Sequence, residues 1–258
     1  MIHIVGSQGI IGRHLLNRFE NNEEVKAQIS DDWNFSSVGE NDLVFYLRSV
    51  SSPFKVMSDP VYSREVNVNK TKVAISKMID VGARVVFASS DVVYGETRDS
   101  FVDEFTPVNP YGEYAIQKCS IEDEFKSERN FLSLRISSVI GDGSNLRKLL
   151  LSRNGIEIFD PVIRTPIHIA DLGDICSGLI KSNFRQDFSN GILNVGGSSP
   201  MSIFEISLLE AKALDIKSPV ATRRSILDKE CRPGTVRMLT TKAQKFANLT
   251  LDLKRHYE

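Results

Sequence analysis

Tyr114 and Lys118 stand four residues apart in the stretch Tyr-Ala-Ile-Gln-Lys. Positions four apart share one face of an α-helix, so this spacing places a phenol beside an ammonium group. A nearby positive charge favours the phenolate and lowers the pKa of a tyrosine from its usual value of about 10, which suits acid–base catalysis at neutral pH. The same spacing also fits a tyrosine ring that simply packs along a lysine side chain, so the pair alone does not establish catalysis.

A glycine-rich turn opens the chain, with the sequence Gly-Ser-Gln-Gly-Ile-Ile-Gly from Gly6 to Gly12. Glycine lets the backbone turn tightly and brings amide groups close to a pyrophosphate, and the N-terminus of the following helix adds unpaired donors and partial positive charge. The spacing departs from the usual G-x-G-x-x-G pattern, and a purely structural turn is the alternative. The residues that we predict to contact a dinucleotide are Gly6, Gln8, Gly9, Ile10, Ile11 and Gly12.

Ser90 ends an apolar run that precedes the tyrosine–lysine pair. A serine hydroxyl, a tunable phenol, a lysine and a phosphate-binding turn together indicate proton-coupled hydride transfer with a nicotinamide. An acidic residue about twenty positions after the glycine turn would bind the adenosine ribose and favour NAD. Asp31 and Asp32 lie near that distance, and we assign Asp31, although loop aspartates that cap a helix or face solvent would look the same. The sequence therefore leaves both NAD and NADP as cofactors.

Composition and charge exclude several classes of function. Of the 258 residues, 41% are hydrophobic and 25% charged, as in ordinary globular proteins. The net charge of -1 at pH 7 gives no reason to expect a nucleic acid or a membrane surface as partner. Cys119, Cys176 and Cys231 are scattered and the four histidines are dispersed, so we expect reduced thiols and neither a disulfide framework nor a metal site. Because we find no signal-peptide pattern and no apolar run long enough to cross a bilayer, we expect a cytoplasmic protein.

The elements that must position these residues follow an alternating pattern. Short apolar runs predict strands over residues 1–5, 25–29, 43–47, 84–88, 132–136 and 192–195. Helical patterns follow the glycine turn, begin at Asp59-Pro60, and begin again at Asn109-Pro110 to carry the tyrosine–lysine pair. Such near-continuous apolar strands separated by helices indicate an α/β fold, a Rossmann-type doubly wound parallel sheet covered on both faces. Residues 30–37 show no helical period and predict a loop or a single turn.

Beyond Gly141 the alternation becomes less regular. Residues 146–151 and 171–180 look helical, residues 156–159 look extended, and Ser202 with Glu205 forms a capping-box pattern. We expect a small C-terminal substrate lobe that is interleaved with the first domain. The predicted dinucleotide-binding domain comprises residues 1–140 and about 164–196, and the predicted lobe comprises about 141–163 and 197–258.

The central motifs resemble those of the extended short-chain dehydrogenase/reductase family, in the branch that holds nucleotide-sugar epimerases, dehydratases and ketoreductases. The most specific part is a strand that ends in Ser-Ser with Val-Tyr-Gly after it, followed by Pro-Tyr-Gly and the tyrosine–lysine helix. The resemblance covers nearly the whole chain through GSQGIIG, DLVFYL, VVFASSDVVYG, NPYGEYAIQK, LSLRISSVIG, RTPIHIADLGDI, ILNVGGSSP and RPGTVRMLTTKAQK.

The resemblance implies a role for each residue of the central motif. Ser90 would hydrogen-bond the substrate oxygen, Tyr114 would pass a proton to or from it, and Lys118 would bind the nicotinamide ribose and lower the pKa of the tyrosine. A Ser90 that only caps the strand end is the alternative. Further implied contacts to the cofactor come from Leu47, Arg48, Ser49, Asn67 and Ser89, and those to the substrate from Asp91, Ser138 and Arg232.

The chain departs from the family's pattern at several of these positions. Asp91 is followed by Val92, whereas 4,6-dehydratases have an aspartate–glutamate pair there, so a standard 4,6-dehydratase is not expected. Arg232 begins the stretch Arg-Pro-Gly-Thr, which is close to the R-x-G-D pattern of relatives. The arginine of that pattern binds a nucleotide diphosphate, because a guanidinium can hold phosphate oxygens with two hydrogen bonds. Thr235 replaces the usual aspartate of that motif, and a solvated arginine is the alternative. Arg48 and Ser49 stand where many relatives have two alanines, and Ser138 stands where several epimerases have an asparagine near the substrate phosphate.

The resemblance implies an NAD(P)-dependent nucleotide-sugar epimerase or 4-ketoreductase that acts in polysaccharide or deoxysugar biosynthesis, and relatives of this kind often form homodimers. Two alternatives stay open. The chain could be an oxidoreductase of the same fold that acts on a non-nucleotide substrate, or a non-catalytic NAD(P)-binding regulator.

Overall fold

A six-stranded parallel sheet forms the centre of the computed structural model, which describes residues 1–21, 24–28, 37–152, 157–160, 162–216, 222–225 and 233–257. The strand order is β10-β5-β4-β3-β1-β2, and every neighbouring pair is parallel. This order confirms the predicted Rossmann-type doubly wound sheet. The strands are β1 (Ile2–Val5), β2 (Val25–Gln28), β3 (Leu43–Tyr46), β4 (Arg84–Ser90), β5 (Phe131–Ile136) and β10 (Ile192–Val195).

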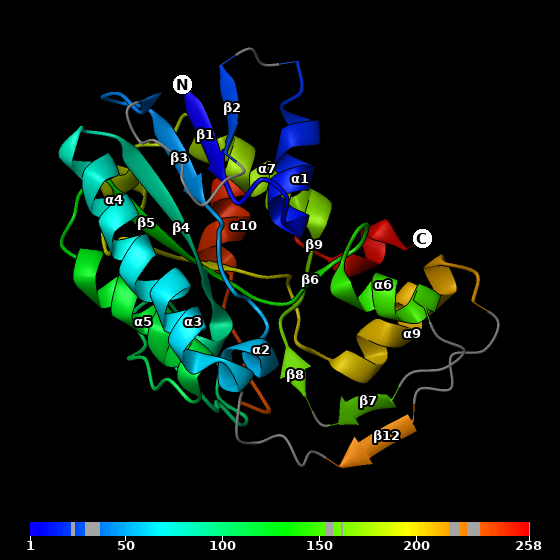
Figure 1. Cartoon of the computed structure of the whole chain (residues 1–258). Helices are drawn as coiled ribbons and strands as arrows, with labels where there is room; N and C mark the ends of the chain where they lie inside the picture. Colours follow the sequence, from blue (N-terminus) through cyan, green and yellow to red (C-terminus); the bar gives the residue numbers. More distant parts are fainter. Residues whose placement is uncertain are drawn as a thin grey trace.

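Helices cover both faces of this sheet (Figure 1). Successive side chains of a strand point to opposite faces, and in β4 Val86 packs into one buried cluster while Val85 and Phe87 pack into the other. The helices of the first cluster are α1 (Ile10–Arg18), α7 (Ile169–Leu179) and α10 (Thr241–Ala247), and those of the second are α4 (Thr71–Asp80) and α5 (Glu113–Phe125).

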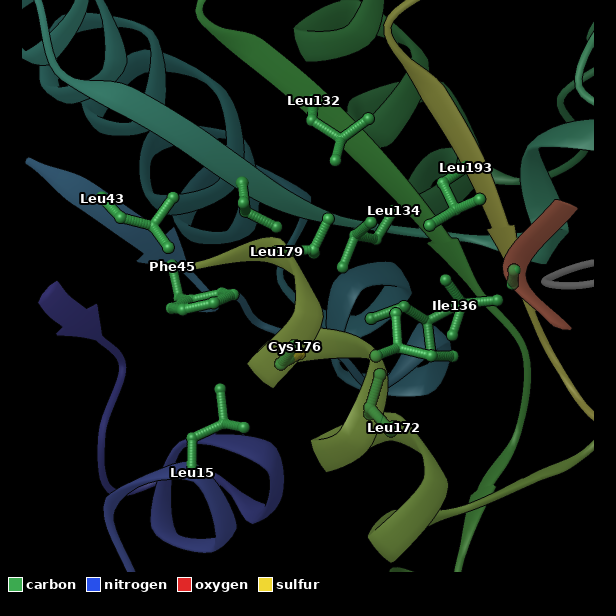
Figure 2. Packing of buried hydrophobic residues seen from close by; sticks show 14 of the residues in the cluster. Leu15, Leu43, Phe45, Leu132, Leu134, Ile136, Leu172, Cys176, Leu179 and Leu193 are labelled. Atoms are coloured by element: carbon green, nitrogen blue, oxygen red, sulfur yellow. The ribbon is translucent and has the colours of Figure 1, made fainter. Parts of the chain in front are cut away.

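The first cluster fastens α1 and α7 to the sheet (Figure 2). Leu15 of α1 and Leu172 and Leu179 of α7 are buried in the same cluster as Phe45 and Leu134 of the sheet. Full burial of one such side chain contributes about 1.5–3 kcal/mol. The helix that follows the glycine turn is therefore held firmly against the strands.

The connection from β3 to β4 begins with two short helices. The first, α2 (Pro53–Ser58), was not predicted. Asp59 then caps α3 (Pro60–Arg64), because its carboxylate accepts a hydrogen bond from Tyr62 N at 3.0 Å. The predicted helix start at Asp59-Pro60 is therefore confirmed.

A π-helical turn, η2 (Glu65–Lys70), separates α3 from α4. Such a turn contains one residue more than an α-helical turn and leaves the backbone carbonyls differently placed. Thr71 Oγ1 donates a hydrogen bond to Val66 O at 2.9 Å beside it. Asn67 lies within this turn.

Helix α5 begins later than predicted, at Glu113. Gly112 precedes it with φ at 85°, a left-handed conformation that an α-helix does not contain. Asn109 N is used in a bond to Val93 O at 3.0 Å. The prediction that Asn109-Pro110 opens this helix was wrong, because these two residues belong to a loop that packs on Val93 and Gly95, beyond the end of β4.

The remaining elements lie mostly beyond β5. The small described sheets pair β6 (Val139–Ile140) with β9 (Ile167–His168), β7 (Glu157–Asp160) with β12 (Thr222–Ser225), and β8 (Ile163–Arg164) with β11 (Met201–Ser202). The other helices and turns are α6 (Asn145–Ser152), α8 (Phe184–Asp187), α9 (Ile203–Ala213), η3 (Asp91–Tyr94) and η4 (Leu253–His256). The predicted helical and extended stretches of this region are confirmed, and the division into two domains stays a prediction.

No helix within the described ranges combines the length and apolar content needed to cross a membrane. The predicted loop over residues 30–37 lies outside the described residues, apart from Ser37.

The capping box of α9 provides a stability test. Ser202 Oγ accepts a hydrogen bond from Glu205 N at 3.1 Å, and Glu205 Oε2 accepts one from Ser202 N at 2.7 Å. We expect Ser202→Ala to lower the free energy of unfolding by about 1 kcal/mol, because a helix amide loses its partner. Urea titration measures this change, with Ser199→Ala at an exposed position as control. Equal stability of the two variants would contradict the prediction.

Candidate active site

The glycine turn lies where β1 ends and α1 begins. Gly6 has φ at 86°, and a Cβ atom on it would lie 2.8 Å from Arg48 N. A Cβ atom on Gly12 would lie 2.4 Å from Gly6 O, and Gly9 N donates a hydrogen bond to that same oxygen at 3.0 Å. These close approaches require glycine, so the turn is packed against the backbone that follows β3.

The exposed part of this turn fits a dinucleotide phosphate. Gly9 is the N-cap of α1 and offers no side chain to the first helical amides, which are natural donors to a phosphate. Gln8 and Gly9 are exposed, Ile10 and Ile11 are half-buried, and Gly12 is buried. The structure thus brings the predicted residues of this motif together in one turn.

Asn67 fastens the segment that follows β3. Its Oδ1 accepts hydrogen bonds from Ser49 Oγ at 3.1 Å and from Val50 N at 2.7 Å. Its Nδ2 donates to Val50 O at 3.1 Å and to Gln117 Oε1 of α5 at 2.8 Å. Of the other predicted cofactor contacts here, Leu47 and Arg48 begin this segment, are half-buried, and pack with their backbone on Gly6 of the glycine turn.

Tyr114, Lys118 and Ser90 meet at the end of β4. Lys118 Nζ donates a hydrogen bond to Ala88 O at 2.7 Å and lies 5.6 Å from the centre of the Tyr114 ring. Tyr114 shares a small apolar cluster with Val92. Ser90 Oγ accepts a hydrogen bond from Val92 N at 3.5 Å and so caps η3. The structure therefore places the predicted phenol, amine and hydroxyl around one strand end, and the capping alternative for Ser90 stays open.

Burial dominates the electrostatics of this pair. It raises the pKa of Tyr114 above the usual range, against a hydrogen bond with Ser49 that lowers it, and the nearby Asp91 raises it further. Burial also lowers the pKa of Lys118 to about 7. The prediction that Lys118 pulls the tyrosine pKa down was wrong for this structure. A low dielectric disfavours the charged forms of both groups, and for Tyr114 this effect of burial is the largest influence on the pKa.

Ser89 faces the opposite side of β4 from Ser90. Its Oγ donates a hydrogen bond of 2.5 Å to Glu122 Oε1, and Glu122 also forms a buried ion pair with Arg135 at 2.7 Å. The hydroxyl of Ser89 is therefore hydrogen-bonded within the core. The backbone of Ser89 is the part that could make its predicted contact with the cofactor.

Asp91 is held by residues that the sequence reasoning missed. Its Oδ2 accepts a hydrogen bond from Ser137 Oγ at 2.7 Å and lies 3.6 Å from Arg164 Nε. Burial raises the pKa of Asp91, and Arg164 acts in the opposite direction. Ser138, a predicted substrate contact, follows Ser137 and is half-buried. The available signals were Ser137, directly after the buried strand β5, and Arg164 in the stretch Ile-Arg-Thr-Pro, but neither pattern identifies Asp91 as the partner.

Two residues that we predict to bind the cofactor or the substrate lie outside the described residues. These are Asp31, assigned to the adenosine ribose, and Arg232, assigned to the nucleotide diphosphate. In the part of the chain that the structure does describe, no group of three or more His, Cys, Asp or Glu residues is placed to hold a metal ion.

Comparison with known sequences gives a match over almost the entire chain. A sequence model of the family described as RmlD substrate binding domain matches residues 1–257. A putative UDP-glucose 4-epimerase from Methanocaldococcus jannaschii is 27% identical, with 80% of this chain and 80% of that protein covered. The methionine adenosyltransferase 2 subunit beta of Xenopus tropicalis is 21% identical, with 83% and 72% covered.

Solved structures of similar fold include nucleotide-sugar and nicotinamide complexes. MoeE5 in complex with UDP-glucuronic acid and NAD is 23% identical, with a TM-score of 0.78 and 99% of this chain and 95% of that chain covered. A dTDP-4-dehydrorhamnose reductase from Clostridium acetobutylicum is 16% identical, with a TM-score of 0.75 and 97% and 94% covered. RMD from Pseudomonas aeruginosa, complexed with NADPH, is 17% identical, with a TM-score of 0.74 and 97% and 93% covered. At these identities the neighbours establish the fold.

The glycine turn yields a test of cofactor binding. We expect Gly12→Ala to weaken NADH and NADPH binding by at least about tenfold, because its Cβ would collide with Gly6 O and displace the turn. Fluorescence titration of both nucleotides measures the affinity. Gly39→Ala is the control, since a Cβ atom there meets nothing closer than Asp42 Oδ2 at 3.8 Å. Unchanged affinity of the Gly12 variant would remove the turn from the cofactor site.

The lowered pKa of Lys118 predicts a pH dependence of stability. The pKa is about 7 in the folded protein, against 10.5 ordinarily. Between these values the unfolded chain binds a proton that the folded protein lacks, so folding becomes more favourable as the pH rises. We expect the Tm without added cofactor to rise from roughly pH 7 to 9 relative to that of Lys118→Met. Parallel Tm profiles of the two proteins would contradict a buried, neutral Lys118.

Proposed function

Because the chain belongs to the RmlD substrate binding domain family, in agreement with the predicted family resemblance, we propose that it is an NAD(P)-dependent nucleotide-sugar epimerase or 4-ketoreductase. One observation carries the proposal at the level of residues. Tyr114 and Lys118 lie side by side against the end of β4, where Ser90 begins the next turn.

The residues that would hold the cofactor lie along the edge of the sheet that starts at the glycine turn. Gly6, Gly9 and Gly12 would hold its pyrophosphate, Asp31 would bind its adenosine ribose, and Lys118 would bind its nicotinamide ribose. The bound nicotinamide supplies or accepts a hydride. NAD and NADPH in solved neighbours of the same fold support this cofactor class.

Tyr114 and Ser90 handle the substrate oxygen. Ser90 donates a hydrogen bond that orients this oxygen, and Tyr114 gives it a proton during reduction or removes one during oxidation. Burial raises the pKa of Tyr114 and keeps the phenol protonated at neutral pH, which is the state from which it donates a proton during reduction. Asp91 is engaged by Ser137 and Arg164, which supports a reaction other than dehydration.

The two parts of the chain have separate roles in this proposal. Residues 1–140 with about 164–196 bind the dinucleotide, and the rest of the chain holds the sugar nucleotide, with Arg232 on its diphosphate and Ser138 beside it. The protein acts in the cytoplasm as a homodimer, in polysaccharide or deoxysugar biosynthesis. Exposed apolar side chains on the outer face of the helices support such self-association: Val61, Tyr62, Val73 and Ile116.

Tyr114→Phe tests the proposed chemistry. We expect kcat with UDP- or dTDP-linked 4-keto sugars to fall by at least about 100-fold, because the proton donor is removed, while NADPH binding is kept. The oxidation of NADPH, followed by absorbance, measures turnover. Tyr111→Phe is the matched control, since Tyr111 is exposed on the loop before α5. Full activity of the Tyr114 variant would remove this residue from the mechanism.

A second candidate function is a non-catalytic cofactor-binding regulator. The observation that favours it is the similarity to proteins named methionine adenosyltransferase 2 subunit beta. A regulator would bind NADPH yet oxidise none of it with any 4-keto sugar. NADPH-dependent reduction of small ketones, without stabilisation by UDP or dTDP, would instead indicate a same-fold oxidoreductase on a non-nucleotide substrate.

A further inference from the structure

A buried ion pair links the catalytic end of β4 to a distant part of the chain. Asp91 directly follows Ser90 and is 3% exposed, and Arg164 of β8 is 4% exposed. Arg164 Nε lies 3.6 Å from Asp91 Oδ2. Ser137 Oγ donates to that same oxygen at 2.7 Å, and Ser90 Oγ donates to Asp91 Oδ1 at 3.3 Å. Asp91 is thus fixed on one side and touches the catalytic hydroxyl on the other.

The other end of the Arg164 guanidinium holds the C-terminal segment 233–235. Nη2 donates to Pro233 O at 2.7 Å, and Nη1 donates to Gly234 O at 3.1 Å and to Ile163 O at 2.7 Å. A guanidinium is a planar fork with five donors, so it can serve several acceptors in fixed directions at once. One side chain therefore touches both Asp91 and this segment.

A second side chain holds segment 233–235 without touching Asp91 in any described contact. Glu96 accepts hydrogen bonds from Gly234 N at 2.7 Å and from Thr235 N at 3.0 Å. Thr97 N donates to Thr235 O at 2.9 Å. Glu96 is exposed, whereas Arg164 is buried. The hydrogen bonds that Arg164 makes to the segment and those that Glu96 makes to it can therefore be removed independently.

We propose that Arg164 is a positioning residue, which couples segment 233–235 to the hydroxyl of Ser90 through Asp91. The inference rests on the proposed function, in which this segment belongs to the part of the chain that holds the sugar nucleotide. A ligand that settles the segment also settles the guanidinium. The guanidinium fixes the carboxylate to which Ser90 donates its single hydroxyl proton until the substrate oxygen accepts it. Substrate binding and alignment of the catalytic serine then depend on one buried side chain.

A purely structural ion pair would have different consequences. Breaking it would lower stability without separating binding from turnover. The chain offers a matched control in Arg147, whose guanidinium pairs with the fully buried Glu210 of α9. Arg147 also pairs with the exposed Asp142. No described contact joins these residues to Ser90, so Arg147→Met reports the cost of losing ion pairs without a path to the serine.

Four variants separate the two arms of the coupling in kcat, KM and Tm. Glu96→Ala should raise KM for the sugar nucleotide by about tenfold and lower kcat by a smaller factor, because the released segment also holds Arg164 less firmly. Asp91→Asn should lower kcat by about 10- to 100-fold with KM kept, because Ser90 loses its alignment. Arg164→Lys should show both effects, since an ammonium cannot reach all the acceptors. Arg147→Met should lower Tm alone.

Two further measurements keep the inference falsifiable. Calorimetric titration with UDP and dTDP should show weaker binding for Glu96→Ala and Arg164→Lys and unchanged binding for Asp91→Asn. In the double variant of Arg164→Lys with Asp91→Asn, the loss in kcat should be smaller than the product of the single losses, because the residues act in series.

The outcomes are distinct for the two proposals. An Arg164→Lys protein that differs from the unaltered chain only in Tm, as Arg147→Met does, overturns the coupling while leaving the function intact. An unaltered chain that neither turns over nor binds any nucleotide sugar overturns the proposed function, and the coupling with it. If Arg164→Lys does not fold, Glu96→Ala decides, because a raised KM with an unaltered kcat overturns the coupling and a parallel loss in kcat supports it.

Discussion

The parallel pairing of β4 between β3 and β5 determines where the chemistry of this protein is located. Its register sets Ser90 opposite Ile136, so the polar residues that follow both strands leave the sheet together. The pairing of β1 with β3 brings the glycine turn to the same edge, where Gly6 packs on the backbone of Arg48. The glycine turn and the proposed proton-transfer residues lie at the same edge because the six strands of the central sheet all run in one direction.

The candidate site lies in a region of low dielectric. Tyr114, Lys118 and Asp91 are all nearly inaccessible to water, and burial is the largest influence on the pKa of each. Charges in such a place interact strongly, and an unpaired charge is costly. This explains why carboxylates around the site are matched with arginines, as Asp91 is with Arg164 and as Glu122 is with Arg135. The charge state of the phenol and amine then depends on the groups that bind beside them.

Local patterns made part of this architecture predictable, and non-local contacts set the rest. The glycine turn, the four-residue spacing of Tyr114 and Lys118 and the capping box of Ser202 each depend on residues close in sequence, and the structure contains all three. The raised pKa of Tyr114 results from burial, with Ser49 and Asp91 as the other influences, which helical spacing cannot reveal. Arg164 likewise escaped prediction, because its acceptors at Pro233 and Gly234 lie 69 and 70 positions away.

The π turn at Glu65–Lys70 has a geometric consequence for the whole connection between β3 and β4. Each residue of an α-helix advances by about 100° around the helix axis. The one extra residue of the π turn therefore rotates the preceding residues about this axis relative to those of α4. Asn67 sits at this phase change, and its amide reaches the backbone at Val50 and the side chain of Gln117. A helix of strict α-periodicity, one residue shorter, would rotate that amide away from one of them. The π turn thus orients the side chain of Asn67 toward Val50 and Gln117, while the apolar face of α4 stays packed on the sheet.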